Sequence, residues 1–180
     1  HAIKSYNTSA KHIKESVETS LKNLHTDYID TLLIHRPDIL LNPIEVAECI
    51  ASLKKEGKIK SFGVSNFTTS QVELLAKHTS IEHHQVEISV TNLNSFNDGT
   101  LDQCQLKNIS AQAWSPWGNG LFTDKTEKNI RIISTAEKLA AQYKTGVNEI
   151  LLAFLYAHPA NIVPVIGTTQ FERIKQAKTA

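Results

Sequence analysis

Two kinds of hydrophobic pattern alternate along this chain. Apolar residues at three- and four-residue spacing predict helices, whereas short unbroken apolar runs rich in strand-forming residues predict buried strands. The helical pattern occurs at residues 9–24, between Asn42 and Gly57, from about 68, near 100–107, at about 128–143 and 147–157, and from about 170. The strand pattern occurs at residues 28–35, 59–64, 85–89, 109–114 and 162–166.

Polar residues suited to capping stand at several predicted helix starts. Thr8 and Ser9 are available before the first helix, and Asn42-Pro43 places a cap before a proline at the first helical position of the second. Thr68 and Gln71 have the spacing of a capping box. The alternation of helix and strand therefore has defined boundaries, and it predicts right-handed βαβ crossovers and a buried parallel sheet.

Five parallel strands are compatible with an open doubly wound sheet or with part of a (β/α)8 barrel. The open sheet predicts a glycine-rich phosphate turn of the GxGxxG type, and none follows a strand here. Polar clusters instead follow every strand, which is typical of a barrel whose loops share one mouth. A complete barrel takes roughly 250 residues, so we expect residues 1–180 to form one barrel domain lacking about three βα units.

The composition narrows the class of protein. Of 180 residues, 41% are hydrophobic and 21% charged, and the net charge of +1 predicts no nucleic-acid partner. The sequence has no run of about 20 apolar residues, so we expect no membrane span. Cys49 and Cys104 stand singly, which predicts reduced thiols in a cytoplasmic protein. Because the sequence contains no methionine, we expect that it continues upstream of His1.

Five segments resemble the aldo-keto reductase family, most closely its bacterial branch with the phrase LLIHRPD. The matching segments, in the family's order and spacing, are LLIHRPD at 32–38, GKIKSFGVSNF at 57–67, QVEIS at 85–89, AWSPWGNG at 113–120, and VPVIGTT with Glu172-Arg173 near the end of the chain. The resemblance implies a (β/α)8 barrel that transfers a hydride from NADPH to a carbonyl carbon.

The family's catalytic tetrad consists of Asp, Tyr, Lys and His. The resemblance assigns the histidine to His35, where a neutral imidazole would orient the substrate carbonyl; a packed histidine at a strand end is the structural alternative. The other three members belong to the family's first three βα units. Lys4 and Tyr6 do not lie in the corresponding motifs, so we expect this chain alone to lack the proton donor and to be inactive.

The resemblance also implies a nicotinamide site. It assigns Ser65, Asn66 and Gln85 to hydrogen bonds with the nicotinamide carboxamide, and Trp114 to the ring stacked beneath the nicotinamide. The structural alternatives are turn capping for Ser65 and Asn66, a buried strand amide for Gln85, and core packing for Trp114. The loop beneath the pyrophosphate contains Ser115, Trp117 and Gly118. In that loop backbone donors matter more than side chains.

At the adenosine end this sequence departs from the common family pattern. Thr168 and Arg173 match a serine and an arginine that bind the 2'-phosphate of NADPH in many family members, whereas Gly167 replaces the usual lysine. The resemblance therefore favours NADPH over NADH, with one cation fewer than usual. Gln176 and Ala177 replace the Glu-Asn pair that commonly contacts adenine.

Several alternatives remain open. A regulatory nicotinamide-binding protein resembling the potassium-channel β subunits would have the same scaffold as a reductase of small carbonyl substrates. An isolated five-strand sheet would expose two edges, which predicts self-association.

His83 and His84 predict no metal site, because adjacent strand residues point to opposite faces. We interpret Asp124–Lys128 as a solvated loop, and the stretch at 90–100 is too polar to indicate a specific ligand.

Overall fold

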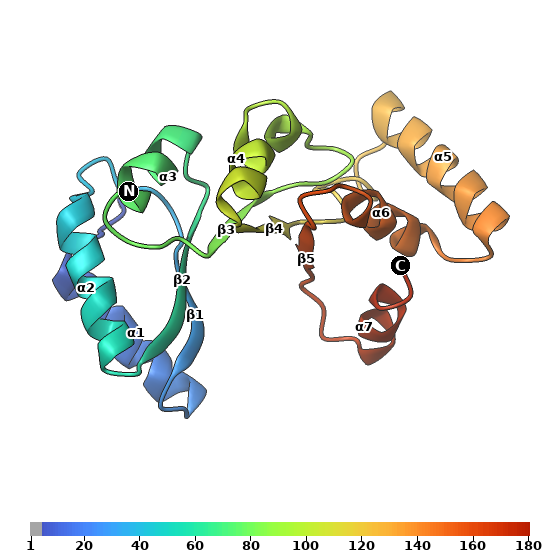
Figure 1. Ribbon diagram of the computed structural model, residues 1–180. Helices are drawn as coiled ribbons and strands as arrows, with labels where there is room; N and C mark the ends of the chain where they lie inside the picture. Colours follow the sequence, from blue (N-terminus) through green and yellow to red (C-terminus); the bar gives the residue numbers. More distant parts are fainter. Residues whose placement is uncertain (1–4) are drawn as a thin grey trace. The chain divides into compact units, whose positions relative to one another are not determined.

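The computed structural model describes residues 5–180, in which helices and parallel strands alternate (Figure 1). The contacts divide the chain into two compact units, His1–Gln85 and Val86–Ala180. The hydrogen-bonded strand order follows the chain from β1 to β5. Such α/β alternation with parallel strands is the pattern predicted for an incomplete (β/α)8 barrel.

The first unit has a three-stranded parallel arrangement with helices packed on it. Its elements are α1 (Ala10–Leu24), β1 (Ile29–Ile34), α2 (Pro43–Lys55), β2 (Ile59–Ser65), α3 (Thr69–Ala76) and the first three residues of β3 (His83–Glu87). Helix α2 contacts β2 and both α1 and α3 (Figure 1). Fully or nearly fully buried Val17, Ile50, Phe62 and Leu75 supply apolar contacts to the core of this unit.

Local sequence explains where these helices begin. The Ser9 side chain accepts a hydrogen bond from His12 N, and the Asn42 side chain accepts from the backbone N–H groups of the two residues after Pro43. Thr68 and Gln71 form both bonds of a capping box at the start of α3. These three predicted helix starts are confirmed, and each cap satisfies amides that the first turn leaves without an intrahelical acceptor.

Strand pairing requires a glycine in β2. Gly63 lies opposite His83, and a Cβ at position 63 would come within 2.7 Å of both the His83 Cβ and Leu33 Cδ2. A larger residue at this position would separate β2 from β3.

The second unit contains the remaining two residues of β3 and all later elements. These elements are η1 (Asn94–Phe96), α4 (Thr100–Lys107), β4 (Ser110–Trp114), α5 (Glu127–Tyr143), α6 (Val147–Tyr156), β5 (Val163–Val165) and α7 (Phe171–Ala177). Strand β4 pairs in parallel with β5, and α5 packs along α6. Leu121, Ala136 and Leu151 form a buried apolar cluster in this unit.

The structure corrects two predicted boundaries. Strand β3 spans His83–Glu87 rather than 85–89, because Ser89 turns the chain through an isolated antiparallel bridge to Asn92. The run Asp124–Lys128 is not wholly a solvated loop, since Lys128 lies in the first turn of α5. The short helix η1 interrupts the stretch at 90–100, for which no helix was predicted.

Among the residues that the structure describes, no helix is both long and apolar enough to cross a membrane.

Candidate functional site

Polar residues collect where strands β1 and β2 end, beside the middle of β3. Ser65 is the last residue of β2 and pairs in register with Gln85 of β3. The Asn66 backbone N–H donates to the Gln85 carbonyl oxygen at 3.0 Å, which extends this pairing by one residue. His35 directly follows β1. Because parallel strands end at the same edge, the register brings these residues together.

Asn66 connects the other three predicted residues of the first unit. Its φ of +59° lies in the left-handed region, which asparagine adopts more readily than most residues. Its side-chain Nδ2 donates to Ser65 Oγ at 2.7 Å and to the His35 carbonyl oxygen at 3.4 Å. Ser65 is only 2% exposed. The group therefore offers hydroxyl and amide donors and acceptors of the kind that a carboxamide needs.

The His35 side chain is exposed and lines a groove of about 560 Å³ within the first unit. Tyr6, His12 and Arg36 line the same groove, together with residues of β1. Tyr6 is in a loop, and Lys4 lies outside the described residues. An accessible imidazole at the end of a strand has room for a substrate oxygen.

Two carboxylates join the segment after His35 to the beginning of α1. Asp38 accepts hydrogen bonds from Leu40 N at 2.9 Å, and from Thr8 N and Thr8 Oγ1 at 3.1 and 3.3 Å. The Leu40 bond, followed by those from Thr8, holds the pKa of Asp38 below its ordinary value. Glu45 accepts from Ala10 N at 2.8 Å. The sequence did not predict these hydrogen bonds, because they join residues about 30 positions apart.

In the second unit, β4 ends at Trp114 and the chain turns sharply. Ser115 has a φ of +51°, and the Gly118 N–H donates to the Ser115 carbonyl oxygen at 2.9 Å. Gly118 has a φ of +87°, and a Cβ there would lie 2.7 Å from Thr91 Oγ1. The turn thus needs glycine both for its backbone conformation and for its contact with the preceding loop. A small, tightly turned backbone of this kind can approach a phosphate closely.

Trp117 has a different role from its neighbours in this turn. Its indole Nε1 donates to the Asn148 carbonyl oxygen at 3.3 Å, and its ring packs against the Leu121–Ala136–Leu151 cluster. The side chain therefore anchors the loop to α5 and α6. Only its backbone is left for a ligand.

Thr168 and Arg173 lie around the start of α7. Thr168 Oγ1 accepts from Gln170 N at 3.2 Å, and Arg173 is exposed on the helix. An exposed guanidinium and a threonine hydroxyl are both groups that can bind a phosphate. No group of three potential metal-ligating side chains occurs in residues 5–180.

One cavity had no counterpart in the sequence prediction. A polar pocket of about 510 Å³ in the second unit is lined by residues of the loop at 91–94, by Glu87 and Asn119, and by Lys128. Its only sequence signals were the asparagines of the stretch at 90–100 and the two-residue spacing of Gln85 and Glu87.

Comparison with known proteins gives consistent results along the whole chain. The model of the aldo/keto reductase family matches residues 2–180. The chain is 44% identical to "Uncharacterized oxidoreductase YcsN" of Bacillus subtilis over 100% of its own length and 61% of that protein. It is 38% identical to a 6-dehydroglucose reductase of Agrobacterium fabrum, covering 99% of this chain and 60% of that one.

A solved structure supports the same relationship. The thermostable aldo-keto reductase Tm1743, crystallised with the inhibitor epalrestat, superposes with a TM-score of 0.84 at 28% identity. The match covers 96% of this chain and 61% of that one, so the chain spans about three-fifths of the proteins it resembles. Family model, sequence relatives and fold agree, and the chain belongs to the aldo/keto reductase family.

Proposed function

We propose that this chain forms the nicotinamide-binding part of an NADP(H)-dependent oxidoreductase that reduces an aldehyde or ketone. One observation carries the proposal. Ser65, Asn66 and Gln85 are joined by strand register and hydrogen bonds at the strand end that His35 follows. This is the arrangement expected of a carboxamide site beside a carbonyl-orienting imidazole.

The residues fit a nicotinamide by their hydrogen-bonding capacity. A carboxamide has one acceptor oxygen and one donor nitrogen, and the two side-chain amides and the Ser65 hydroxyl can complement both. Fixing the carboxamide would fix which face of the ring points to the substrate. When bound, the cofactor supplies the hydride that goes to the carbonyl carbon.

His35 would donate a hydrogen bond to the substrate carbonyl oxygen and so hold the carbon in position for reduction. The proton that this oxygen acquires would come from the family's tyrosine, whose motif is not in this sequence. We therefore propose that the 180-residue chain alone does not turn over. Joined to a segment that carries the Asp, Tyr and Lys, it would complete the reaction.

The preference for NADPH would come from the second unit. Thr168 and Arg173 offer a hydroxyl and a cation for the 2'-phosphate, and the backbone at Ser115 and Gly118 would approach the pyrophosphate. We assign the Trp114 ring to stacking on the nicotinamide. The free buried thiols of Cys49 and Cys104 are consistent with a reducing, cytoplasmic location.

The substrate class can be narrowed by the relatives. A protein 38% identical to this chain is named a 6-dehydroglucose reductase, so a sugar carrying an aldehyde is the first substrate to test. Aromatic aldehydes form the comparison class, because they have a carbonyl but no hydroxyl groups.

The test is NADPH oxidation followed at 340 nm with the protein expressed from its complete gene. We expect turnover with at least one of these aldehydes, and we expect Asn66→Ala to raise the KM for NADPH about tenfold through the lost hydrogen bonds. Asn23→Ala, on the exposed surface of α1, is the matched control. Cofactor binding without any turnover would instead favour a regulatory protein like the potassium-channel β subunits.

We also propose that the 180-residue chain self-associates when produced alone. Among the described strands β1 pairs only with β2, and Val163 and Val165 of β5 are 48% and 40% exposed. Unpaired apolar strand edges bind other edges. Light scattering that gives a monomer mass at high protein concentration would contradict this proposal.

A further inference from the structure

A groove of about 490 Å³ lies beside helices α5 and α6 of the second unit, which pack along one another (Figure 1). We call it the α5–α6 groove. Its lining is mainly apolar and includes Leu139, Ile150, Ala153 and Phe154. A neighbouring hollow of about 340 Å³ shares three of these residues, so the apolar lining continues beyond the groove. Both volumes lie within the roughly 300–1,000 Å³ that is usual for small-molecule sites.

The α5–α6 groove contains one buried acidic side chain. Glu149 is 7% exposed and lies in the first turn of α6. A Cβ built on Gly146 would overlap Glu149 Oε2, so the carboxylate folds back over that glycine at the start of the helix. The positive end of the helix dipole stabilises a carboxylate there, which offsets part of the cost of burying its charge.

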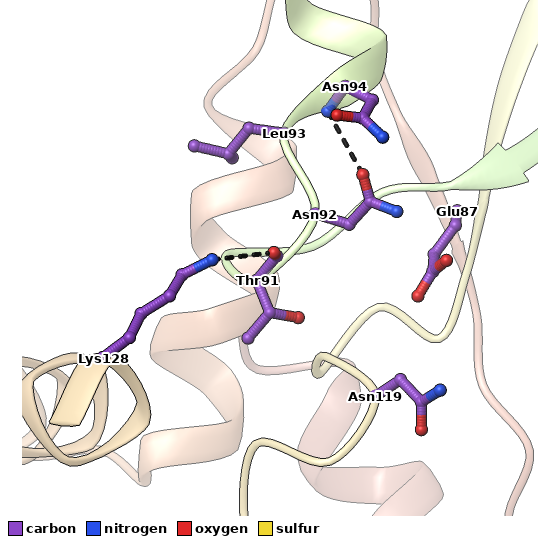
Figure 2. Close-up of a pocket in the computed structure, with 7 residues that line it drawn as sticks. All are labelled: Glu87, Thr91, Asn92, Leu93, Asn94, Asn119 and Lys128. Atoms are coloured by element: carbon purple, nitrogen blue, oxygen red, sulfur yellow. Dashed lines mark hydrogen bonds between the residues drawn. The ribbon is translucent and has the colours of Figure 1, made fainter. Parts of the chain in front are cut away.

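The Glu149 carboxylate has no partner of its own. Among residues 5–180 it forms no hydrogen bond and no ion pair, and the Thr145 hydroxyl that lines the same groove forms none either. No lysine, arginine or histidine of the described chain lines the α5–α6 groove. In the polar pocket of Figure 2, by contrast, Glu87 shares the cavity with Lys128. A buried charge without a counterion is costly, so the α5–α6 groove favours a ligand that brings a positive charge.

A primary ammonium group matches the acceptors of this groove. It carries three N–H donors, which the Glu149 carboxylate and the Thr145 hydroxyl can accept. Tyr143 lines the same groove, and the face of an aromatic ring also attracts a cation. An apolar chain on the nitrogen would pack against Leu139 and Phe154.

The neighbouring hollow limits the ligand to one positive charge. Arg131 lines that hollow, and its guanidinium is already paired with Glu127 at 3.6 Å. A second ammonium group would lie among apolar side chains close to this cation, with no carboxylate left to accept it. The hollow therefore suits the apolar chain of the ligand and disfavours a diamine.

We infer that the α5–α6 groove binds a primary amine with an apolar chain, in its protonated form. Glu149 accepts the ammonium group, and the apolar residues shared by the groove and the hollow hold the chain. The site contains none of the residues that we assign to the cofactor or to the carbonyl substrate. It is a further ligand site, and it does not depend on the proposed reductase function.

Isothermal titration calorimetry with n-hexylamine hydrochloride at neutral pH tests this inference on the protein expressed from its complete gene. Glu149→Gln keeps the shape of the side chain and removes its charge, so it should weaken binding about tenfold or more. Leu139→Lys places a cation in the groove at a position that is 37% exposed, and it should weaken binding as well. Glu137→Gln on the exposed surface of α5 is the matched control and should leave the Kd within about twofold.

Two further ligands separate the contribution of the charge from that of the chain. We expect 1,6-diaminohexane to bind about fivefold more weakly than hexylamine, and we expect hexanoate, which has the opposite charge, to give no binding heat. Equal binding of hexanoate or of the diamine would overturn the inference, and so would a Kd that Glu149→Gln leaves unchanged.

Urea unfolding shows whether each variant folds. If Glu149→Gln does not fold, the loss of binding in Leu139→Lys decides, because that substitution leaves the first turn of α6 intact. No binding of hexylamine to the unaltered protein would mean that the groove is closed or covered by another part of the complete chain, and the inference would be wrong.

Discussion

Replacing Gly118 with alanine should destabilise the turn after β4 through two separable effects. At a φ of +87° an alanine has an unfavourable backbone conformation, which costs about 1–2 kcal/mol. The new Cβ would also lie 2.7 Å from Thr91 Oγ1 and 3.0 Å from Thr91 Cγ2. Relieving such an overlap in a packed loop costs a further 1–3 kcal/mol, roughly.

A matched glycine isolates the second effect. Gly57 has a φ of +72°, but nothing lies within 4 Å of a Cβ built there. Gly57→Ala should therefore show only the backbone cost, whereas Gly118→Ala should show both. Urea unfolding followed by far-ultraviolet circular dichroism measures the two losses of unfolding free energy.

A double-mutant cycle identifies the residue responsible for the overlap. Thr91→Ala removes both atoms that the new Cβ would meet, so Gly118→Ala in that background should cost no more than Gly57→Ala does. Equal losses for Gly57→Ala and Gly118→Ala, or an undiminished loss in the Thr91→Ala background, would refute the contact between this turn and the loop at 91–94.

Three further predictions concern the first unit and the adenosine end. Asp38→Asn should lower the urea midpoint at neutral pH. Because folding lowers the pKa of Asp38, its carboxylate stabilises the fold fully above the unfolded pKa, and this stabilisation is lost as the pH falls through the folded pKa. If the urea midpoints of the two proteins differ as much at about pH 2 as at neutral pH, the hydrogen bonds to Asp38 do not stabilise the fold in this way. His35→Asn should lower kcat/KM for an aldehyde about 10²- to 10³-fold, whereas Tyr6→Phe should leave kcat within about twofold; a large loss from Tyr6→Phe would mean that the proton donor is in this chain. Arg173→Ala should raise the KM for NADPH about tenfold and leave that for NADH unchanged, and equal changes would argue against a 2'-phosphate contact.

Local chemistry was predictable from the sequence wherever it acts over a few residues. Ser9, Asn42 and the Thr68–Gln71 pair cap their helices as predicted, because a cap needs only a side chain and amides two or three positions away. The five strands are all present, although β3 begins two residues early. The apolar run at 85–89 does not show that Ser89 accepts hydrogen bonds from the loop after β3, and these bonds end the strand before Ser89.

Contacts between distant segments were not predictable in the same way. The sequence suggested Thr8 as a helix cap, yet its hydroxyl and its N–H both donate to Asp38, 30 positions away. Lys128 was placed where a charged run meets a predicted helix, but its hydrogen bond to the Thr91 carbonyl oxygen was not predicted. Such contacts depend on how elements pack, and single-sequence periodicity does not determine this.

The error at β3 left the predicted nicotinamide site unaffected for a geometric reason. Side chains of a strand alternate between two faces, so Gln85 and Glu87 share a face of β3 whichever of the two boundaries is used. In the structure Gln85 pairs with Ser65, and Glu87 is the last residue of β3 instead of the centre of the predicted strand. At the end of a parallel strand Glu87 meets the loops that follow β3 and β4, and it lines a pocket with Thr91 and Asn119.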